Sequence, residues 1–363
     1  MIQPIIGSSE RLEERRTGES FVDRMIANGT WREEVIPAQV VGLSRDITVF
    51  RAQRKGNFIA YDWHGDRDTF CPPIWWDLAI GSGACGLGCR ACFLMLTFRA
   101  MRDPLRHVLY ENVSDLWDAA EAWLSHPKRR PFHTLGIGID RSDSLLYEGV
   151  TGHVRALIPM FANKNDNPQN CKIILLTKST NVHYLNGLPT ANIIVSFSLN
   201  PEPIADLWEG KYQDTLERIT PPINKRLRAC LVAQEMGFET RWRIDPILTP
   251  ENWISLYEQF FEEAANLNLN PRYITLGTYR EKNKMLDLWR EKWRLPEMEW
   301  QPNELAQEGT HRHLPDAERV NMYQHISSLA RRFFPLSKIS LCKETHTVRK
   351  ALGLCNVDCN CLM

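Results

Sequence analysis

The feature that most constrains this chain is a glycine-rich stretch with three cysteines, Cys85, Cys89 and Cys92. On a helix, this spacing would place all three on one face as a buried row of thiols. The same stretch contains four glycines, each of which would cost a helix about 1 kcal/mol. They are Gly81, Gly83, Gly86 and Gly88. The pattern therefore predicts a loop that passes close to a bound group.

Three thiolates and free backbone N–H groups in one loop suit an iron–sulfur cluster, because its sulfides accept hydrogen bonds. With three protein ligands, a four-iron cluster keeps one iron open to a further ligand. Zinc and three thiols without metal are the alternatives that the residues leave open. We predict that Cys85, Cys89 and Cys92 ligate a 4Fe–4S cluster.

The length and amino-acid composition are typical of a soluble enzyme. The 363 residues can bury one large core, and 44 basic residues balance 44 acidic ones. Nucleic-acid binding would therefore need a local basic patch. No apolar run approaches the ~18 residues of a membrane span, and we expect no signal peptide. Ten clustered cysteines predict metal binding in a reducing cytoplasm rather than a disulfide scaffold.

Apolar strands alternate with helical patterns from residue 75 onward, which predicts βα units and a parallel sheet. The predicted strands are 75–80, 134–140, 172–179, 192–200, 239–248 and 272–280, with 338–341 as a last addition. The predicted helices begin at 112 and span 148–162, 222–236 and 250–266. Two short strands, 47–50 and 57–61, are expected to form a small N-terminal layer.

We therefore expect an α/β fold of three parts. Residues 75–345 form a partial (β/α)6 TIM-type barrel, 1–74 an N-terminal extension and 346–363 a Cys-rich C-terminal tail. Period-two alternation gives several strands one polar face, for example Ser196, Ser198 and Asn200. That face should line an open barrel that holds a polar ligand, unless these are solvated edge strands.

Polar side chains stand where predicted strands end. Lys178 follows the apolar run 173–176, and Ser198 and Asn200 end the next strand. Arg243 lies on the polar face of the fifth predicted strand. Active-site groups of such barrels come from the carboxyl ends of strands. We expect these four residues to contact a cofactor or substrate, although each alone could equally be a surface or capping residue.

The cysteine loop resembles the signature of the radical S-adenosylmethionine (SAM) enzymes. The order of further motifs is similar to that of spore photoproduct lyase and its relatives, over residues 75–345. Those motifs are Leu176-Thr-Lys178, Phe197-Ser-Leu-Asn200 and Leu341-Cys-Lys-Glu-Thr345. The resemblance implies homolytic SAM cleavage, hydrogen abstraction from a thymine-type base in DNA and an electron donor such as flavodoxin or ferredoxin. It also implies that Lys178, Ser198, Asn200 and Arg243 bind SAM or substrate.

Three positions depart from that family. Ala91 stands where an aromatic residue usually precedes the third cysteine, and Phe93 replaces the tyrosine that follows it. The hydrogen-donor cysteine after the second barrel strand is missing, because residues 138–143 contain no cysteine. Rearrangement or hypermodification of the base is thus an alternative to lyase repair. A radical SAM enzyme for a small molecule or peptide and a non-catalytic metal-binding nucleic-acid module are further alternatives.

The C-terminal region adds four sulfurs, Cys342, Cys355, Cys359 and Cys361. They could ligate a second cluster or zinc, one could return a hydrogen atom, or they could remain unpaired thiols. Four basic stretches with nearby aromatic residues are candidates for nucleic-acid contact. They are 128–130, 225–226, 241–243 and 279–282.

Overall fold

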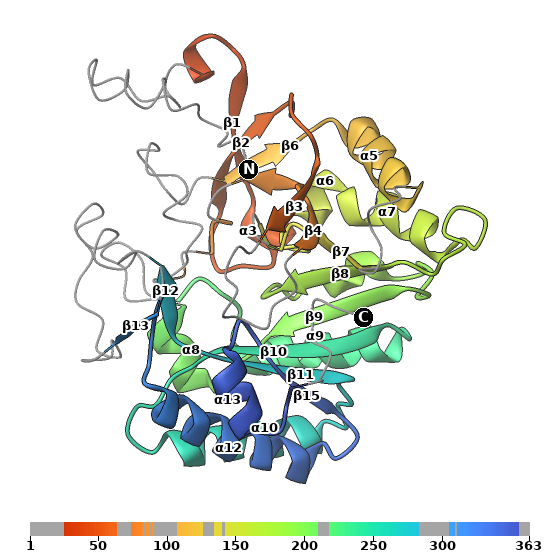
Figure 1. The fold of residues 1–363 in the computed structure, drawn as a ribbon. Helices are drawn as coiled ribbons and strands as arrows, with labels where there is room; N and C mark the ends of the chain where they lie inside the picture. The colour runs from red at the N-terminus through yellow and green to blue at the C-terminus, as the bar shows by residue number, and fades with distance from the viewer. Residues whose placement is uncertain are drawn as a thin grey trace.

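The structure is a computed structural model. It describes residues 25–63, 74–82, 85–87, 89, 107–125, 134–139, 142–209, 218–282, 305–308 and 311–355. At its centre lies an eight-stranded sheet with the strand order β15-β11-β10-β9-β8-β7-β4-β3 (Figure 1). The chain order of these strands is β3 (Ile59–Trp63), β4 (Ile74–Leu78), β7 (Thr134–Ile137), β8 (Lys172–Thr177), β9 (Ile193–Ser198), β10 (Glu239–Ile247), β11 (Tyr273–Thr278) and β15 (Lys338–Leu341).

The sheet confirms the predicted α/β class and its barrel-like core. Neighbouring strands from β4 to β15 pair in parallel, and β3 adds an antiparallel edge beside β4. The parallel strands number seven rather than six, because residues 338–341 do form the last strand.

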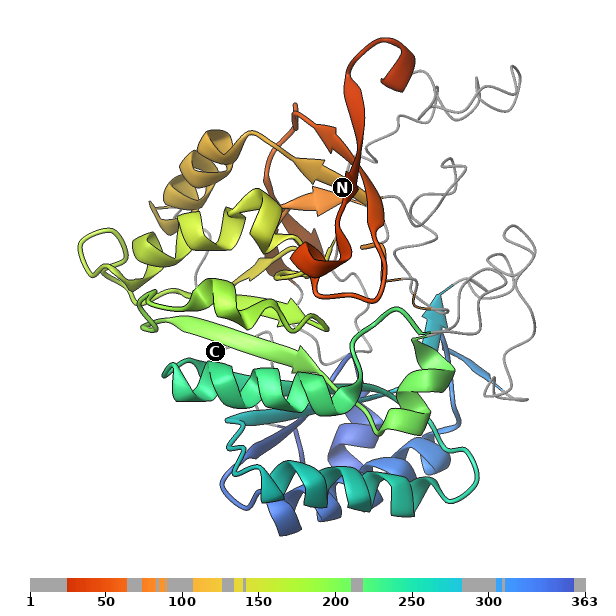
Figure 2. The same ribbon diagram turned by 180° about the vertical axis from the view of Figure 1, so that it is seen from behind.

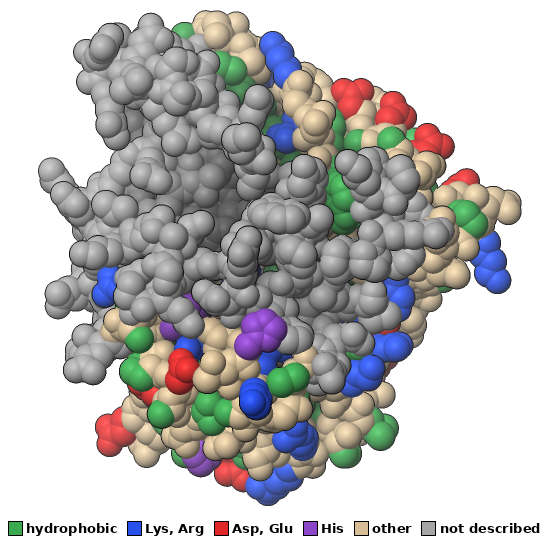
Figure 3. All heavy atoms as spheres, in the orientation of Figure 1, with side chains coloured by type: hydrophobic (Ala, Val, Ile, Leu, Met, Phe, Trp, Pro, Cys, Tyr) green, Lys and Arg blue, Asp and Glu red, His purple; other side chains and the backbone are tan. Residues whose placement is uncertain are grey.

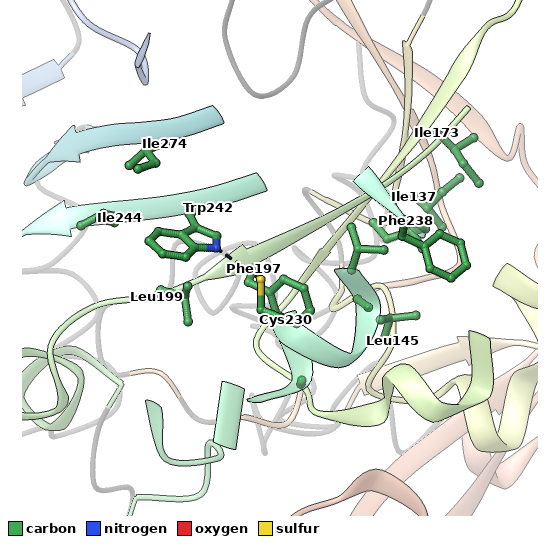
Figure 4. Close-up of a cluster of buried hydrophobic side chains, with 14 of the residues drawn as sticks. Ile137, Leu145, Ile173, Phe197, Leu199, Cys230, Phe238, Trp242, Ile244 and Ile274 are labelled. Atoms are coloured by element: carbon green, nitrogen blue, oxygen red, sulfur yellow. Dashed lines mark hydrogen bonds between the residues drawn. The ribbon is translucent and has the colours of Figure 1, made fainter. Parts of the chain in front are cut away.

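Helices cover the outer face of this sheet (Figures 1 and 2). They are α5 (Val113–Ser125), α7 (His153–Ala162), α9 (Ile223–Glu235), α10 (Trp253–Asn266) and α12 (Asp316–Phe333). Trp242 of β10 shows how the core forms: its ring packs on Phe260 and Phe334, and its Nε1 donates to the sulfur of Cys230 at 3.3 Å (Figure 4).

The alternation predicted for β9 and β10 is confirmed. Phe197 and Trp242 lie in the apolar core beside the helices, so Ser198 and Arg243 extend from the opposite face of the sheet. The polar face is therefore turned away from the helical layer, as the sequence pattern predicts.

The N-terminal layer differs from the prediction. Strands 47–50 and 57–61 do not pair with each other. β2 (Ile47–Ala52) joins β1 (Trp31–Ile36), β6 (His107–Tyr110) and β5 (Gly81–Ser82) in a separate sheet, while β3 joins the main sheet. Strand pairing thus crosses the expected boundary at residue 74 in both directions. The prediction fails here because β2 pairs in parallel with β6, a long-range contact that no local sequence pattern reveals.

Turn residues explain several element ends. Asn170 and Asn192 adopt positive φ angles just before β8 and β9, and Asn268 does so just after α10, a conformation that asparagine tolerates. Gly152, at φ 64°, divides the predicted helix 148–162 into α6 (Glu148–Thr151) and α7. α10 begins at Trp253 rather than at Pro250, as expected from the sequence, because Asn252 is left-handed at φ 61° and cannot continue a helix.

Smaller elements complete the described chain. They are α3 (Ala38–Val41), η2 (Asn181–Leu185), α8 (Glu202–Trp208), α13 (His346–Ala351) and a small sheet of β12 (Arg280–Lys282), β14 (His311–His313) and β13 (Ala306–Glu308). α13 lies within the predicted tail. Thr345 caps it by accepting a hydrogen bond from the Val348 N–H at 3.3 Å, so the tail begins as a helix.

Candidate active site

The cysteine loop follows β5 at the end of the second sheet. Within the described part of the loop, residues 85–87 and 89 form no helix, in agreement with the glycine argument. Cys85 is half-buried and Cys89 is buried, whereas Cys92 lies outside the described residues. Gly86 has φ +79°, and a Cβ there would lie 2.7 Å from the Tyr147 hydroxyl oxygen. Both facts make glycine necessary at this position.

Tyr147 anchors the loop from the segment just before α6. Its hydroxyl donates to the backbone carbonyl of Cys85 at 2.6 Å, and its ring stacks on His107 with centroids 5.4 Å apart. Burial raises the pKa of Tyr147 well above its usual value, so the phenol keeps its proton and remains a donor. The Nε2 of His107 in turn lies 2.9 Å from the Ser142 hydroxyl.

The polar face of the sheet brings three predicted residues into one row. Ser198 pairs in register with Arg243, and the Lys178 Nζ donates to the Ser198 hydroxyl at 2.6 Å. The row lies at the carboxyl ends of β8 and β9, and Arg243 extends it to the middle of β10. The geometry therefore joins Lys178 to Ser198 directly, as their positions at strand ends suggest.

Asp143 fixes the start of this row. Its carboxylate accepts hydrogen bonds from the backbone N–H of Lys178 at 2.6 Å and from the Thr177 hydroxyl at 2.7 Å. Two backbone donors of its own turn, Leu145 and Leu146, complete the shell at 3.1 and 3.0 Å. Burial raises the pKa of Asp143 against these hydrogen bonds. Asp143 is a residue that sequence reasoning missed.

Glu209 is a second residue that sequence reasoning missed. It follows α8, is buried, and accepts hydrogen bonds from Lys178 Nζ at 2.8 Å and from the Thr220 hydroxyl at 2.7 Å. Arg226 of α9 pairs with both of its carboxylate oxygens. Burial would raise the pKa of Glu209, but Arg226 and Lys178 outweigh it and hold the pKa far below its usual range.

Asn200 lies apart from this row. Its Nδ2 donates to the Pro246 carbonyl at 3.2 Å, and its Oδ1 accepts from the Tyr257 hydroxyl at 3.0 Å. Both ends of the amide thus hold protein groups, which tie the end of β9 to α10. A ligand contact by Asn200 stays a prediction.

Arg243 belongs to a charged cluster at the far side of the sheet. The carboxylate of Asp245 accepts from Arg243 at 3.3 Å and from two nitrogens of Arg280 at 3.0 and 2.8 Å. The Cys342 sulfur accepts from Arg243 at 2.8 Å and from Arg280 at 3.4 Å. Burial would raise the pKa of Asp245, but Arg280 and Arg243 lower it. Gly277 leaves room for the Asp245 carboxylate, because a Cβ at position 277 would lie 2.6 Å from Asp245 Cγ.

The predicted second set of thiols is described only in part. Cys342 is held by the arginines and Cys355 is half-buried after α13, whereas Cys359 and Cys361 lie outside the described residues. Within the described ranges, no group of three or more His, Cys, Asp or Glu side chains is arranged to hold a metal ion. The complete set of Cys85, Cys89 and Cys92 is not covered by those ranges, because Cys92 lies outside the described residues.

The expected basic patches need correction. Arg226 and Arg241 are fully buried in ion pairs with Glu209 and Glu239, so neither lies on the surface as a phosphate contact. Residues 128–130 fall outside the described part of the chain. The outer face of α5 is acidic, with Asp115, Asp118 and Glu121 exposed (Figure 3). This face would repel nucleic acid. No described helix has the length and apolar character needed to span a bilayer.

Comparison with known proteins supplies a fold. No family model and no curated protein matches the sequence. Spore photoproduct lyase in complex with dinucleoside spore photoproduct matches the structure with a TM-score of 0.63 and 16% identity, over 80% of this chain and 82% of that chain. A double-substituted variant of that enzyme with bound SAM and the same dinucleoside gives 0.62 and 16%, over 80% of each chain. SuiB from Streptococcus suis bound to SAM is a weaker match, at 0.45 and 12% over 74% of this chain and 50% of that chain. The predicted resemblance to spore photoproduct lyase is thus confirmed at the level of the fold.

Proposed function

We propose that the chain is a radical SAM enzyme that acts on a thymine-type base in DNA. Cys85, Cys89 and Cys92 would hold a 4Fe–4S cluster, and Lys178 and Ser198 would bind SAM. With both cofactors bound, the reduced cluster supplies homolytic cleavage of SAM and hence a 5′-deoxyadenosyl radical that abstracts hydrogen. The single observation that carries the proposal is the fold shared with spore photoproduct lyase, combined with the cysteine loop.

The residues present fit such a cluster. Cys85 and Cys89 offer soft sulfur donors from one glycine-bent loop, and the Tyr147 hydrogen bond fixes the loop backbone beside Cys85. A guanidinium is also within electrostatic reach: burial lowers the pKa of Arg226, but Glu209 and, among smaller contributions, Cys89 raise it. A nearby cation offsets the negative charge of thiolate ligands.

The polar row suits a cofactor with an amino-acid end. Lys178 presents an ammonium at the carboxyl edge of the sheet, held by Ser198, and a carboxylate is its natural partner. Arg243, which lies on β10 beside Ser198 in the main sheet, would contact SAM or substrate. The enzyme would be cytoplasmic and would draw electrons from a donor such as flavodoxin or ferredoxin.

The structural neighbour supports the proposed class of substrate. The matched spore photoproduct lyase carries a dinucleoside, so a nucleotide or DNA base is the class to test first. The direct experiment is an anaerobic incubation of reduced protein with SAM and DNA whose thymine bases are deuterated at every carbon-bound position. Deuterium in 5′-deoxyadenosine is the expected result. SAM cleavage without label transfer from DNA would instead favour a small molecule or peptide substrate, and nucleic-acid binding without SAM cleavage would favour a non-catalytic module.

A second reaction, rearrangement or hypermodification of the base, is favoured by one observation. The segment that carries the hydrogen-donor cysteine in the resembling family has none here, and its Asp143 holds four hydrogen bonds of the protein itself. We therefore expect spore photoproduct to be a poor substrate that yields wrongly quenched products. Product analysis with wild type and with a truncation after Leu354 decides the point. Clean restoration of two thymines by the truncated protein contradicts the expectation, and clean repair by wild type alone locates the donor among the last nine residues.

A further inference from the structure

The contacts of Glu209 differ from those of Glu148 and Asp143, two other buried carboxylates. Glu148 and Asp143 accept mainly backbone N–H groups, whereas Glu209 receives only side-chain donors, from Lys178, Thr220 and Arg226. The side chains of Glu209 and Arg226 are 2% and 0% exposed, while that of Lys178 is 18% exposed. These side chains therefore extend from the buried ion pair of Glu209 and Arg226 to the partly exposed Lys178 at the carboxyl end of β8.

We infer that Glu209 is a positioning residue, which fixes the Lys178 ammonium beside Ser198 so that it can bind the carboxylate of an amino-acid-type ligand. This inference rests on the proposed function, in which that ligand is SAM. It extends the proposal to two residues, Glu209 and its partner Arg226, that would bind no ligand themselves.

The hydrogen bonds of Lys178 fix the direction of its ammonium group. An ammonium has three N–H donors, and among the described residues two of those of Lys178 are used, by Ser198 at 2.6 Å and Glu209 at 2.8 Å. These two acceptors fix the direction of the third donor. A free lysine has about 2 kcal/mol of rotamer entropy to lose on binding a ligand, and prior restraint of its head group reduces that cost.

The three charged side chains of this group together attract an anion. Lys178 and Arg226 each carry one positive charge and Glu209 one negative charge, so the three together are cationic. Arg226 neutralises the buried carboxylate through two bonds, which leaves the charge of Lys178 available for an incoming anion. Without Arg226, Lys178 would be the main counter-ion of Glu209 and would attract a ligand carboxylate less strongly.

The group around Glu209 is also held rigidly. Arg226 also donates to the backbone carbonyls of Ser198 at 3.1 Å and Pro221 at 2.9 Å. The same guanidinium therefore holds the carboxylate that positions Lys178 and the backbone of the residue to which Lys178 donates. Thr220 adds a bond to the second carboxylate oxygen. The whole group can hold its shape before a ligand arrives.

The experiment compares two ligands that differ in the amino-acid end. Anaerobically reconstituted protein is titrated with SAM and with 5′-methylthioadenosine, which keeps the nucleoside but has no carboxylate. We expect Glu209→Gln to weaken SAM binding by about 10- to 100-fold, the range for one hydrogen bond to a charged group. Binding of 5′-methylthioadenosine should change by less than about twofold, because that ligand has no carboxylate for Lys178 to bind.

A double-mutant cycle and a matched control complete the test. In a Lys178→Met background, Glu209→Gln should have no further effect on SAM affinity, because its action passes through Lys178. Glu148→Gln removes another buried carboxylate, one that holds the backbone of Val154 and Arg155, and should leave both affinities unchanged. Iron content and the thermal midpoint are measured for each variant.

The outcomes separate the two proposals. Equal loss of both ligands in Glu209→Gln, or a further loss in the Lys178→Met background, overturns the positioning role and leaves the proposed function standing. Failure of wild type to bind SAM overturns the proposed function and, with it, the inference. If Glu209→Gln does not fold, Glu209→Asp replaces it: the charge stays, the carboxylate retracts by one methylene, and the same selective loss of SAM is expected.

Discussion

The hydroxyl of Tyr147 donates a hydrogen bond of 2.6 Å to the backbone carbonyl of Cys85, the first cysteine of the loop. The tyrosine is itself held by its stack on His107. This contact ties the loop to the segment before α6, at the point where Gly86 bends the chain. The position of the Cys85 sulfur therefore depends on a side chain 62 residues away.

Removal of that hydroxyl is the first prediction. Tyr147→Phe should lower the iron and sulfide content obtained on reconstitution by about fivefold, because one hydrogen bond is worth about 1 kcal/mol. Tyr110→Phe is the matched control: its hydroxyl accepts from Arg54 at 3.0 Å, away from the cysteine loop. Both variants should lose similar stability in urea, and only the first should lose cluster. Equal cluster content in the two variants would contradict the anchoring role.

The fit between Gly277 and Asp245 gives a second prediction. Gly277→Ala places a Cβ 2.6 Å from Asp245 Cγ, which should cost about 1–3 kcal/mol as overpacking and displace the carboxylate from Arg280. Urea unfolding measures the loss. The cost should largely vanish in an Asp245→Ala background, since the clash is with that side chain. Gly56→Ala, with no atom within 4 Å of the new Cβ, is the control. A cost that persists without Asp245 would argue for another cause.

His153 predicts a pH dependence of stability. Burial lowers its pKa from 6.5 to about 4, and its Nε2–H donates to the Tyr110 carbonyl at 2.8 Å. The unfolded chain therefore takes up a proton near pH 6.5 that the folded chain refuses until about pH 4. Stability from neutral His153 is complete above pH 6.5 and falls by about 3 kcal/mol as the pH drops to 4.

His153→Gln should flatten this part of the profile, measured as the free energy of unfolding in urea between pH 7.5 and 4. The exposed His183 provides the comparison, and His183→Gln should keep the wild-type slope. An unchanged slope in His153→Gln would show that other groups cause the acid loss.

The sequence predicts the sheet well because its strands are local patterns. The apolar run from Ile173 to Leu176 predicts a strand, and the alternation in β9 and β10 predicts both a strand and its buried face. The expectation that active-site groups stand at strand ends selected Lys178 and Ser198, which form a hydrogen bond in the structure. Arg226 was read as a surface charge because it stands beside Lys225. Its place on the apolar face of α9, with Ile223 and Cys230, was the signal of its burial.

Other parts of the site have no local signal. Glu209 gains its role only when α9 brings Arg226 to it, and Tyr147 only when the cysteine loop folds over it. In the sequence Asp143 resembles an ordinary turn residue, and only the folded structure places it beside the end of β8, where it binds the backbone N–H of Lys178. These contacts join distant segments, so a reading by periodicity and spacing cannot find them.

The C-terminal thiols give a further prediction. The sulfur of Cys342 already accepts from two guanidinium groups, which compete with a metal ion, so it should not complete a four-thiolate site. A Cys85/Cys89/Cys92 triple alanine variant should therefore retain neither iron nor zinc after reconstitution, as measured by elemental analysis. Residual metal that disappears when Cys342→Ala is added would contradict this and establish a second metal site.

The most direct test of the central claim is SAM cleavage by the reduced protein under anaerobic conditions. The reconstituted wild type should show the absorption of a 4Fe–4S cluster and form 5′-deoxyadenosine and methionine from SAM. Cys89→Ala should lose both, whereas Cys171→Ala, at a fully buried cysteine before β8, should keep both. Chromatographic assay of 5′-deoxyadenosine decides it. Wild-type rates of SAM cleavage in Cys89→Ala, or no cleavage by a wild type that holds its cluster, would contradict the proposed function.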